Sequence, residues 1–260
     1  MYTVLHTLLS DKKGGLVFTC FGVWHLFYIL LAFCLALAVI LYLKKRGASV
    51  RERVICRLIH IAFGIYLADF FLMPLAYGEI DIEKLPFHIC TVTCVLCFLS
   101  RHIRFWEKYR VQIALVAFLS NLVYLIYPAG VMWHQVHPLS YRVVQTLIFH
   151  AVMTVYGLMV LIFDTERLQW KTCYRDLVLL VLITAWALLG NLCYNGSLGD
   201  YQHFFNWFFV IRDPFYRLPE AVAPYCMPFI NIALFFSAEM LIYGVYLTVE
   251  KRKSKKAAGS

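Results

Sequence analysis

Seven long apolar runs constrain this chain more than any other feature of its sequence. About 20 consecutive apolar residues are enough for a helix to cross the hydrocarbon core of a bilayer. The third and fourth runs lie near the lower limit of that length, and the other five are longer. Each run is therefore predicted to form a transmembrane helix. The runs cover about residues 17–43, 54–77, 85–100, 111–127, 139–163, 177–194 and 226–249.

The rest of the composition agrees with a membrane protein. Of the 260 residues, 62% are hydrophobic and 15% are charged, whereas soluble domains are about half apolar and a quarter charged. The length suits one membrane bundle and leaves no room for a soluble domain beside it. We therefore predict an all-α polytopic membrane helix bundle of about seven transmembrane helices over residues 1–250, followed by a basic tail over residues 251–260.

The positions of lysine and arginine indicate which helix ends face the cytoplasm. Most of the 24 basic residues lie in the turns after the first, third and fifth runs and in the tail. Cytoplasmic loops carry an excess of lysine and arginine, so the N-terminus is predicted outside and the C-terminus in the cytoplasm. The net charge of +9 then reflects topology and affinity for anionic lipids at the cytoplasmic face. No nucleic-acid partner is predicted.

The nine cysteines do not indicate a disulfide scaffold, because their number is odd and most of them lie in the runs or on the predicted cytoplasmic side. Cys94 and Cys97 form C-x-x-C inside an apolar run without a second pair, so packing is favoured over a redox or metal role. Cys193 and Cys226 lie near the outer ends of two runs, and a disulfide between them stays open. The sequence has no paired C-x-x-C, H-E-x-x-H or Walker motif, so no metal and no cofactor are predicted.

Polar and ionisable residues inside the runs are the candidates for function. Such groups are costly in a membrane and usually face a bundle interior or a water-filled cavity. With a rise of 1.5 Å per residue, Asp69 is expected about 12 Å from the outer end of its helix, His150 about 16 Å and His88 about 5 Å. Asn191 lies near the outer end of the sixth run and Glu239 near the middle of the seventh. Four of these residues fall in the outer half, which predicts a site that opens outward.

These polar residues also have structural interpretations. Asp69 would pair with a neighbour such as Arg142 and so join two helices. Glu239 would be a protonated structural carboxyl. Asn121 and Gln145 are expected to make hydrogen bonds between helices.

The sequence LPFHIC marks the start of the third run. Pro86 suits the first turn of a helix, where its missing N–H costs nothing, so it is expected to fix the helix start and to hold His88 rigidly. His88 and Thr91 are i, i+3 neighbours on one face. Cys90 points roughly 200° away from His88 at 100° per residue. A histidine that activates Cys90 is therefore expected from another helix, and His150 is the candidate.

Several short motifs resemble the YwaF family of bacterial integral membrane proteins, which follow a seven-span plan. The YwaF family is in turn distantly similar to the eukaryotic transmembrane protein 164 family, implicated as lipid acyltransferases that use an intramembrane cysteine and histidine. It also shares a comparable bundle with the androgen-induced lipid hydrolases, which use threonine and histidine. The motifs are LPFHIC, Tyr127-Pro128, QTLIFH (Gln145 to His150), Asn191 and Tyr194.

The resemblance implies two histidines for the site and leaves the nucleophile in question. His88 corresponds to the histidine of the third span, and His150 to that of the fifth. In the acyltransferases the cysteine directly precedes the span-three histidine, and this chain has Phe87 at that position. Cys90 or Thr91 would have to take the role of the missing cysteine.

We therefore expect a lipid acyltransferase, transacylase or hydrolase of the bacterial cytoplasmic membrane, with membrane lipids as substrates. His150 would act as general base, Cys90 (second choice Thr91) as nucleophile, and His88 as the group that orients the nucleophile or stabilises the oxyanion. The supporting residues would be Asp69 or Asn191, which would fix a histidine tautomer, together with Gln145, Tyr194 and Glu239.

Two other functional classes stay open. A proton-coupled carrier of small solutes would use Asp69, Glu239 and the two histidines as a protonation relay, but the sequence shows no internal repeat of the kind from which many carriers are built. A seven-span receptor would share the predicted orientation, but the last run lacks an N-P-x-x-Y pattern.

The predicted orientation is testable by labelling. In a cysteine-free background, single cysteines introduced as Lys45→Cys and Gly199→Cys should react with a membrane-impermeant maleimide from opposite sides, because the basic turn is predicted inside and the last long loop outside. Reaction of both positions from the cytoplasmic side would contradict the orientation.

Overall fold

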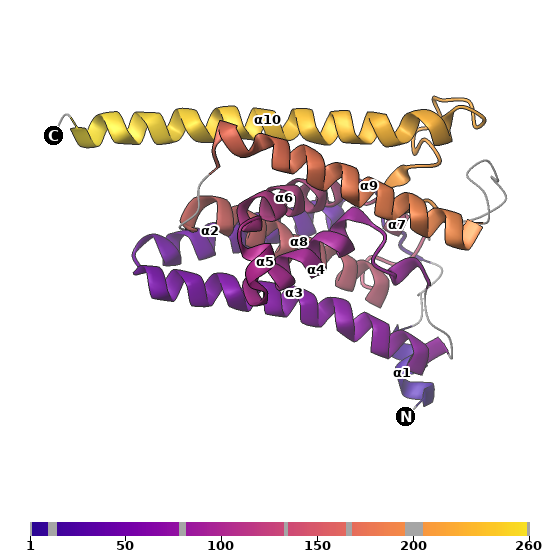
Figure 1. Ribbon diagram of the computed structural model, residues 1–260. Helices are drawn as coiled ribbons and strands as arrows, with labels where there is room; N and C mark the ends of the chain where they lie inside the picture. Colours follow the sequence, from indigo (N-terminus) through magenta and orange to yellow (C-terminus); the bar gives the residue numbers. More distant parts are fainter. Residues whose placement is uncertain are drawn as a thin grey trace.

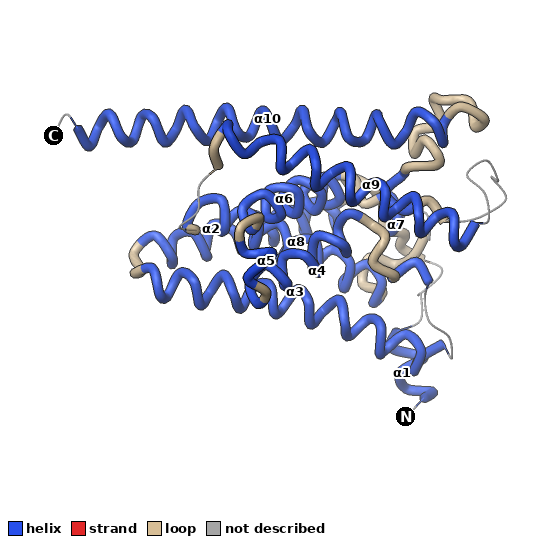
Figure 2. The backbone as a smooth tube through the Cα atoms, in the orientation of Figure 1, coloured by secondary structure: helices blue, strands red, loops and turns tan. Residues whose placement is uncertain are grey.

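The computed structural model describes residues 2–9, 15–77, 82–132, 135–164, 168–195 and 205–258. All regular structure within these ranges is helical (Figures 1 and 2). The 3-10 helices are η1 Ile82–Lys84, η2 Trp170–Thr172 and η3 Trp207–Phe209. The α-helices are α1 Tyr2–Leu9, α2 Val23–Lys44, α3 Ala48–Tyr77, α4 Ile89–His102, α5 Arg104–Glu107, α6 Arg110–Ile126, α7 Ala129–Met132, α8 Tyr141–Phe163, α9 Cys173–Asn195 and α10 Ala223–Ala258.

The expected all-α membrane bundle is confirmed. Six helical segments in the described part of the chain are long and apolar enough to cross a membrane, and they correspond to six of the seven predicted runs. The segments are Val23–Lys44, Ala48–Pro74, Arg110–Met132, Tyr141–Phe163, Trp170–Tyr194 and Ala223–Arg252. The start of α1 and the end of α10 lie at opposite ends of the bundle (Figure 1), and the orientation of these ends relative to a membrane stays a prediction.

The third predicted run, residues 85–100, forms the shorter helix α4. Its 14 residues span about 21 Å at 1.5 Å per residue, less than the hydrocarbon core of about 30 Å. The helix begins at Ile89 because His88 occupies the N-cap position with extended backbone angles. The prediction that Pro86 stands in the first helical turn is therefore wrong, and Pro86 lies in a turn just before the N-cap.

The centre of the bundle consists of α6 and α8, most of whose residues are buried. Gly157 of α8 permits their close approach, because a Cβ there would lie 2.7 Å from the Ala114 carbonyl oxygen of α6. Small residues at such contacts are typical of membrane helices, whose association depends on close packing. The helices α3 and α4 pack on this centre, α9 and α10 pack on each other, and α10 runs along one edge of the bundle (Figure 1).

Several helices meet at the buried carboxylate of Asp164, the C-cap residue of α8. One of its oxygens accepts a hydrogen bond from Arg101 of α4 at 3.1 Å, and the other accepts one from Arg110 of α6 at 2.6 Å. Arg101 also pairs with Glu52 of α3, and Arg110 lies 3.7 Å from the exposed Glu107. Charged groups from α3, α4, α5 and α6 thus meet the C-cap of α8 at one end of the bundle.

Removing the central carboxylate should destabilise the bundle. We expect Asp164→Asn to lower the free energy of unfolding by about 3–5 kcal/mol, because breaking a buried ion pair leaves its partner uncompensated. Glu107→Gln is the matched control, and an exposed pair of this kind contributes about 0–1 kcal/mol. Denaturant unfolding in mild detergent measures both changes, and equal losses in the two variants would contradict a special role of Asp164.

Candidate functional site

The segment before α4 is fixed by aromatic side chains of α9 and η3. The Trp186 indole donates a hydrogen bond to the Pro86 carbonyl at 2.6 Å. The Phe87 ring stacks on Trp186, with ring centroids 5.1 Å apart, and also contacts Tyr194 and Trp207. Phe87 thus occupies a packing position, at the place where the resemblance implies a catalytic cysteine.

The helix η3 is a strained segment that covers the start of α4. Phe208 and Phe209 have φ values of 56° and 52°, in the left-handed region that non-glycine residues rarely adopt. Two asparagines hold them: Asn191 of α9 exchanges hydrogen bonds with the Trp207 backbone, and Asn231 of α10 donates to the carbonyls of Phe208 and Phe209. Backbone strain of this kind persists only where the surrounding structure over-determines it.

The chain that follows η3 is organised by Asp213, which lies outside the membrane-spanning segments. Its carboxylate accepts hydrogen bonds from the backbone N–H groups of Phe215, Arg217 and Leu218 at 2.8–3.0 Å. These hydrogen bonds hold the pKa of Asp213 below its usual range, and the bond from Phe215 has the largest effect. The carboxylate therefore stays charged at neutral pH and keeps this connection folded beside the site.

His88 faces η3, where its Nδ1 accepts a hydrogen bond from the Phe208 backbone N–H at 3.2 Å. A neutral imidazole has one donor nitrogen and one acceptor nitrogen. Because Nδ1 of His88 is the acceptor, its proton is on Nε2. The strained segment therefore gives His88 the Nε2–H tautomer, with that N–H available as a donor.

His150 lies in α8 and has the opposite arrangement. Its Nδ1 donates to the Thr146 carbonyl at 2.7 Å, and its ring stacks on Tyr124 with centroids 3.8 Å apart. The side chain is 5% exposed, and its Nε2 has no hydrogen-bond partner among the described residues. With the proton on Nδ1, Nε2 of His150 is a buried acceptor without a donor.

Lys84 joins the two histidines into one electrostatic group. Its ammonium interacts with His88, with His150 and with the Cys90 thiol, and the two imidazoles also interact with each other. Lys84 forms an ion pair with Asp69 at 2.8 Å, so the predicted pairing of Asp69 with Arg142 is replaced by one with Lys84. Sequence reasoning missed Lys84, although a charged residue two positions before Pro86 was a visible signal.

The two candidate nucleophiles lie in the first turn of α4. Cys90 is a buried free thiol, and in the described part of the chain the imidazole hydrogen bonds of His88 and His150 go to backbone groups and not to this thiol. Thr91 is partly buried, and its hydroxyl donates to the His88 carbonyl at 2.9 Å. Cys90 and Thr91 therefore both lie at the end of α4 that carries His88. In the described part of the chain, neither side chain forms a hydrogen bond with an imidazole.

Two predicted supporting roles are wrong in detail. The histidine tautomers are set by the Thr146 carbonyl and by the Phe208 N–H, not by Asp69 or Asn191. Asn191 instead positions η3, and Tyr194 belongs to the aromatic group around Phe87.

Among the described residues, Asn121 and Gln145 also do not form the expected hydrogen bonds between helices. Asn121 donates to Ala117 within α6, and Gln145 accepts from its neighbour Thr146 within α8.

Glu239 of α10 lies apart from this group. Its carboxyl is fully buried, neither oxygen has a hydrogen-bond partner among the described residues, and it interacts with Asp176. Asp176 accepts a hydrogen bond from Tyr243 at 2.6 Å and lies about 22 Å along α9 from Asn191 at 1.5 Å per residue. Glu239 therefore belongs to a separate polar contact between α9 and α10.

The cysteines outside α4's first turn show no disulfide. Cys94 and Cys97 are fully buried in the apolar core, and Cys193 and Cys226 are both free thiols.

The opposite tautomers of the two histidines are testable by NMR. In protein labelled with ¹⁵N-histidine at neutral pH, we expect a bare Nδ1 for His88 and a bare Nε2 for His150, because Nδ1 of His88 accepts a hydrogen bond from the Phe208 N–H whereas Nδ1 of His150 donates one to the Thr146 carbonyl. The variants His88→Gln and His150→Gln assign the signals. The same tautomer at both positions would contradict this arrangement.

Most of the chain matches a known protein family. A family model, the TMEM164 family, matches residues 20–247. No curated protein and no solved structure matches the chain. The matched range takes in α2, α3, α4, α6, α8 and α9 and therefore includes all the histidines and candidate nucleophiles described above. The resemblance to the YwaF family stays a prediction. This multi-pass helical membrane protein belongs to the TMEM164 family.

Proposed function

We propose that the chain is an intramembrane lipid acyltransferase, transacylase or hydrolase that reacts through an acyl-enzyme. The observation that carries the proposal is the pair of interacting imidazoles with opposite tautomers, one offering an acceptor and the other a donor. Acyl transfer needs both, a base for the nucleophile and a donor for the oxyanion. Membership of the TMEM164 family supports the same class of reaction.

In the first step, the nucleophile attacks the carbonyl carbon of a lipid ester. Nε2 of His150 accepts the proton of the Cys90 thiol, or of the Thr91 hydroxyl, while the new S–C or O–C bond forms. A general base must come within about 2.6–3.2 Å of the proton donor, and such contacts are often longer before substrate binds. Cys90 therefore has to approach His150 when the lipid enters.

The resulting oxyanion is stabilised by groups from the start of α4 and from η1. His88 donates its Nε2–H, and the Lys84 ammonium adds positive charge nearby. When the intermediate collapses, the ester C–O bond breaks and the leaving alkoxide takes the proton from His150. A second lipid hydroxyl or water then attacks the acyl-enzyme, and His150 again takes the proton. The S–C or O–C bond of the acyl-enzyme breaks, the departing thiolate or alkoxide takes that proton back from His150, and the product is a transferred acyl chain or a free fatty acid.

The partners and location follow from the same proposal. The substrates are membrane lipids, which reach the site from the bilayer, and anionic lipids bind the basic helix ends on the cytoplasmic side. The resemblance to the YwaF family supports a bacterial cytoplasmic membrane as the location.

The carrier alternative is less well supported. A protonation relay would require Glu239 beside the histidines, and Glu239 instead interacts electrostatically with Asp176, near the other end of α9.

Lipid turnover in reconstituted bilayers tests the proposal. We expect His150→Ala to reduce the release or transfer of a radiolabelled acyl chain by at least about 100-fold, since general base catalysis contributes about 10²–10⁴. Cys90→Ser should cause a comparable loss if the thiol is the nucleophile, and Thr91→Val if the hydroxyl is. Cys34→Ser, at an exposed position of α2, is the control and should retain full turnover.

Two results would overturn the proposal. One is full turnover by folded His150→Ala protein, and the other is full turnover by both nucleophile variants. Elution of each variant as a single peak in detergent shows that it is folded.

A further inference from the structure

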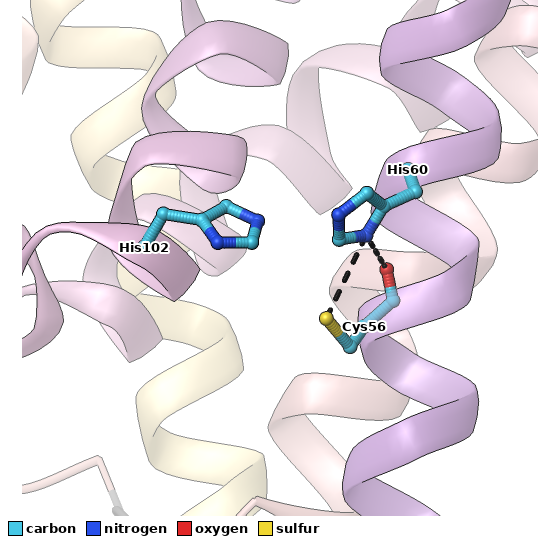
Figure 3. A group of neighbouring side chains, drawn as sticks. All are labelled: Cys56, His60 and His102. Atoms are coloured by element: carbon cyan, nitrogen blue, oxygen red, sulfur yellow. Dashed lines mark hydrogen bonds between the residues drawn. The ribbon is translucent and has the colours of Figure 1, made fainter.

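A second group of reactive side chains lies at the far end of α4. It consists of Cys56 and His60, one turn apart on α3, and His102, the last residue of α4 (Figure 3). Each residue offers one ligand atom, and these three atoms all lie within 4.8 Å of one another. None of these residues takes part in the site proposed for lipid chemistry.

The orientation of the two imidazoles suits a shared ligand. Nδ1 of His60 donates to the Cys56 carbonyl at 2.6 Å, which leaves Nε2 as the acceptor. In Figure 3 the other nitrogen of His60, Nε2, faces the His102 ring, whereas the Cys56 thiol lies 3.6 Å from Nδ1. Metal-binding histidines almost always donate their other N–H to a carbonyl, a carboxylate or water, and His60 has that arrangement.

Phe98 holds both rings in place. Its ring centroid lies 4.5 Å from that of His102 and 5.4 Å from that of His60. The two imidazoles stand nearly perpendicular, with centroids 5.0 Å apart. Arg101 precedes His102 in the chain and forms ion pairs with Glu52 and Asp164. These carboxylates compensate its positive charge and so reduce its repulsion of a bound cation.

We infer that Cys56, His60 and His102 form a Zn²⁺ site. Zinc binds thiolate and imidazole ligands tetrahedrally, with Zn–S about 2.3 Å and Zn–N about 2.0–2.1 Å, so the ligand atoms are about 3.5 Å apart. The three atoms therefore need to approach by roughly 1 Å, which rotation of partly and fully exposed side chains provides. Three protein ligands leave a fourth position for water or another small ligand.

The site joins α3 to α4 at the end opposite the histidine pair. At the other end, the same two helices are linked through Asp69 of α3 and Lys84, just before α4. A bound ion at Cys56, His60 and His102 would hold the C-terminal end of α4 against α3 and so fix the position of α4 along α3. Binding of Zn²⁺ therefore stabilises the folded bundle, because the unfolded chain does not hold the three ligands together.

Metal binding by the full-length, tag-free protein in detergent tests the inference. We expect about one Zn²⁺ per chain by elemental analysis after desalting, and a higher Tm with Zn²⁺ than without it. Loss of an outer partner of a metal ligand lowers affinity about 10–100-fold, so loss of a ligand itself should lower it by at least about 100-fold. The ligand variants are Cys56→Ser, His60→Gln and His102→Gln.

Cobalt identifies the thiolate ligand. With Co²⁺ in place of Zn²⁺, the wild-type protein should show the visible bands of tetrahedral cobalt and a thiolate charge-transfer band in the near ultraviolet, and Cys56→Ser should lose the latter. Cys34→Ser, at an exposed cysteine of α2, is the matched control and should bind like wild type. Wild-type affinity in folded His102→Gln protein, or no Zn²⁺ on the wild type, would overturn the inference. Neither measurement depends on lipid turnover.

Discussion

The shortness of α4 is the constraint on which the site depends. A helix of 14 residues cannot cross a bilayer of about 30 Å, so one of its ends must lie inside the bundle. Four N–H groups at a helix start have no partner within the helix, and irregular backbone at membrane depth is tolerated only where protein or water surrounds it. The fold places η1 and η3 around this end, and these segments then carry Lys84 and the Phe208 N–H to the histidines.

Holding an irregular segment beside a helix start requires side chains that bond to backbone. Asn191 and Asn231 provide them from two different spanning helices, and the resulting geometry includes the positive φ values of Phe208 and Phe209. The strain has a chemical consequence, because the Phe208 N–H is the group that selects the tautomer of His88. Packing of α9 and α10 is thereby linked to the protonation pattern at α4.

Hydropathy predicted the long helices well because each needs only local composition. The same reasoning made His88 and His150 candidates from their placement inside apolar runs, and their roles stay predictions. Hydropathy did not predict contacts between side chains that lie far apart in the sequence. Lys84 forms the ion pair with Asp69 because η1 folds back over α3. The sequence alone does not indicate whether Lys84 or Arg142 is the partner of Asp69. His102 lies far along the chain from His60, so its contact with His60 follows only from the packing of α4 on α3.

Phe87, at the position where the resemblance implies a cysteine, is part of a closely packed group of side chains. Phe87 fills a space whose other wall is Gly190, where even a Cβ would overlap the Phe87 ring. A cysteine at position 87 would leave this space between Trp186 and Trp207 unfilled, at a cost that grows with cavity volume. Phe87 and Gly190 are thus complementary, and Phe87→Cys alone would destabilise the support of α4. If the proposed acyl-enzyme forms, Cys90 and Thr91 in the first turn of α4, beyond the N-cap, are therefore the candidate nucleophiles.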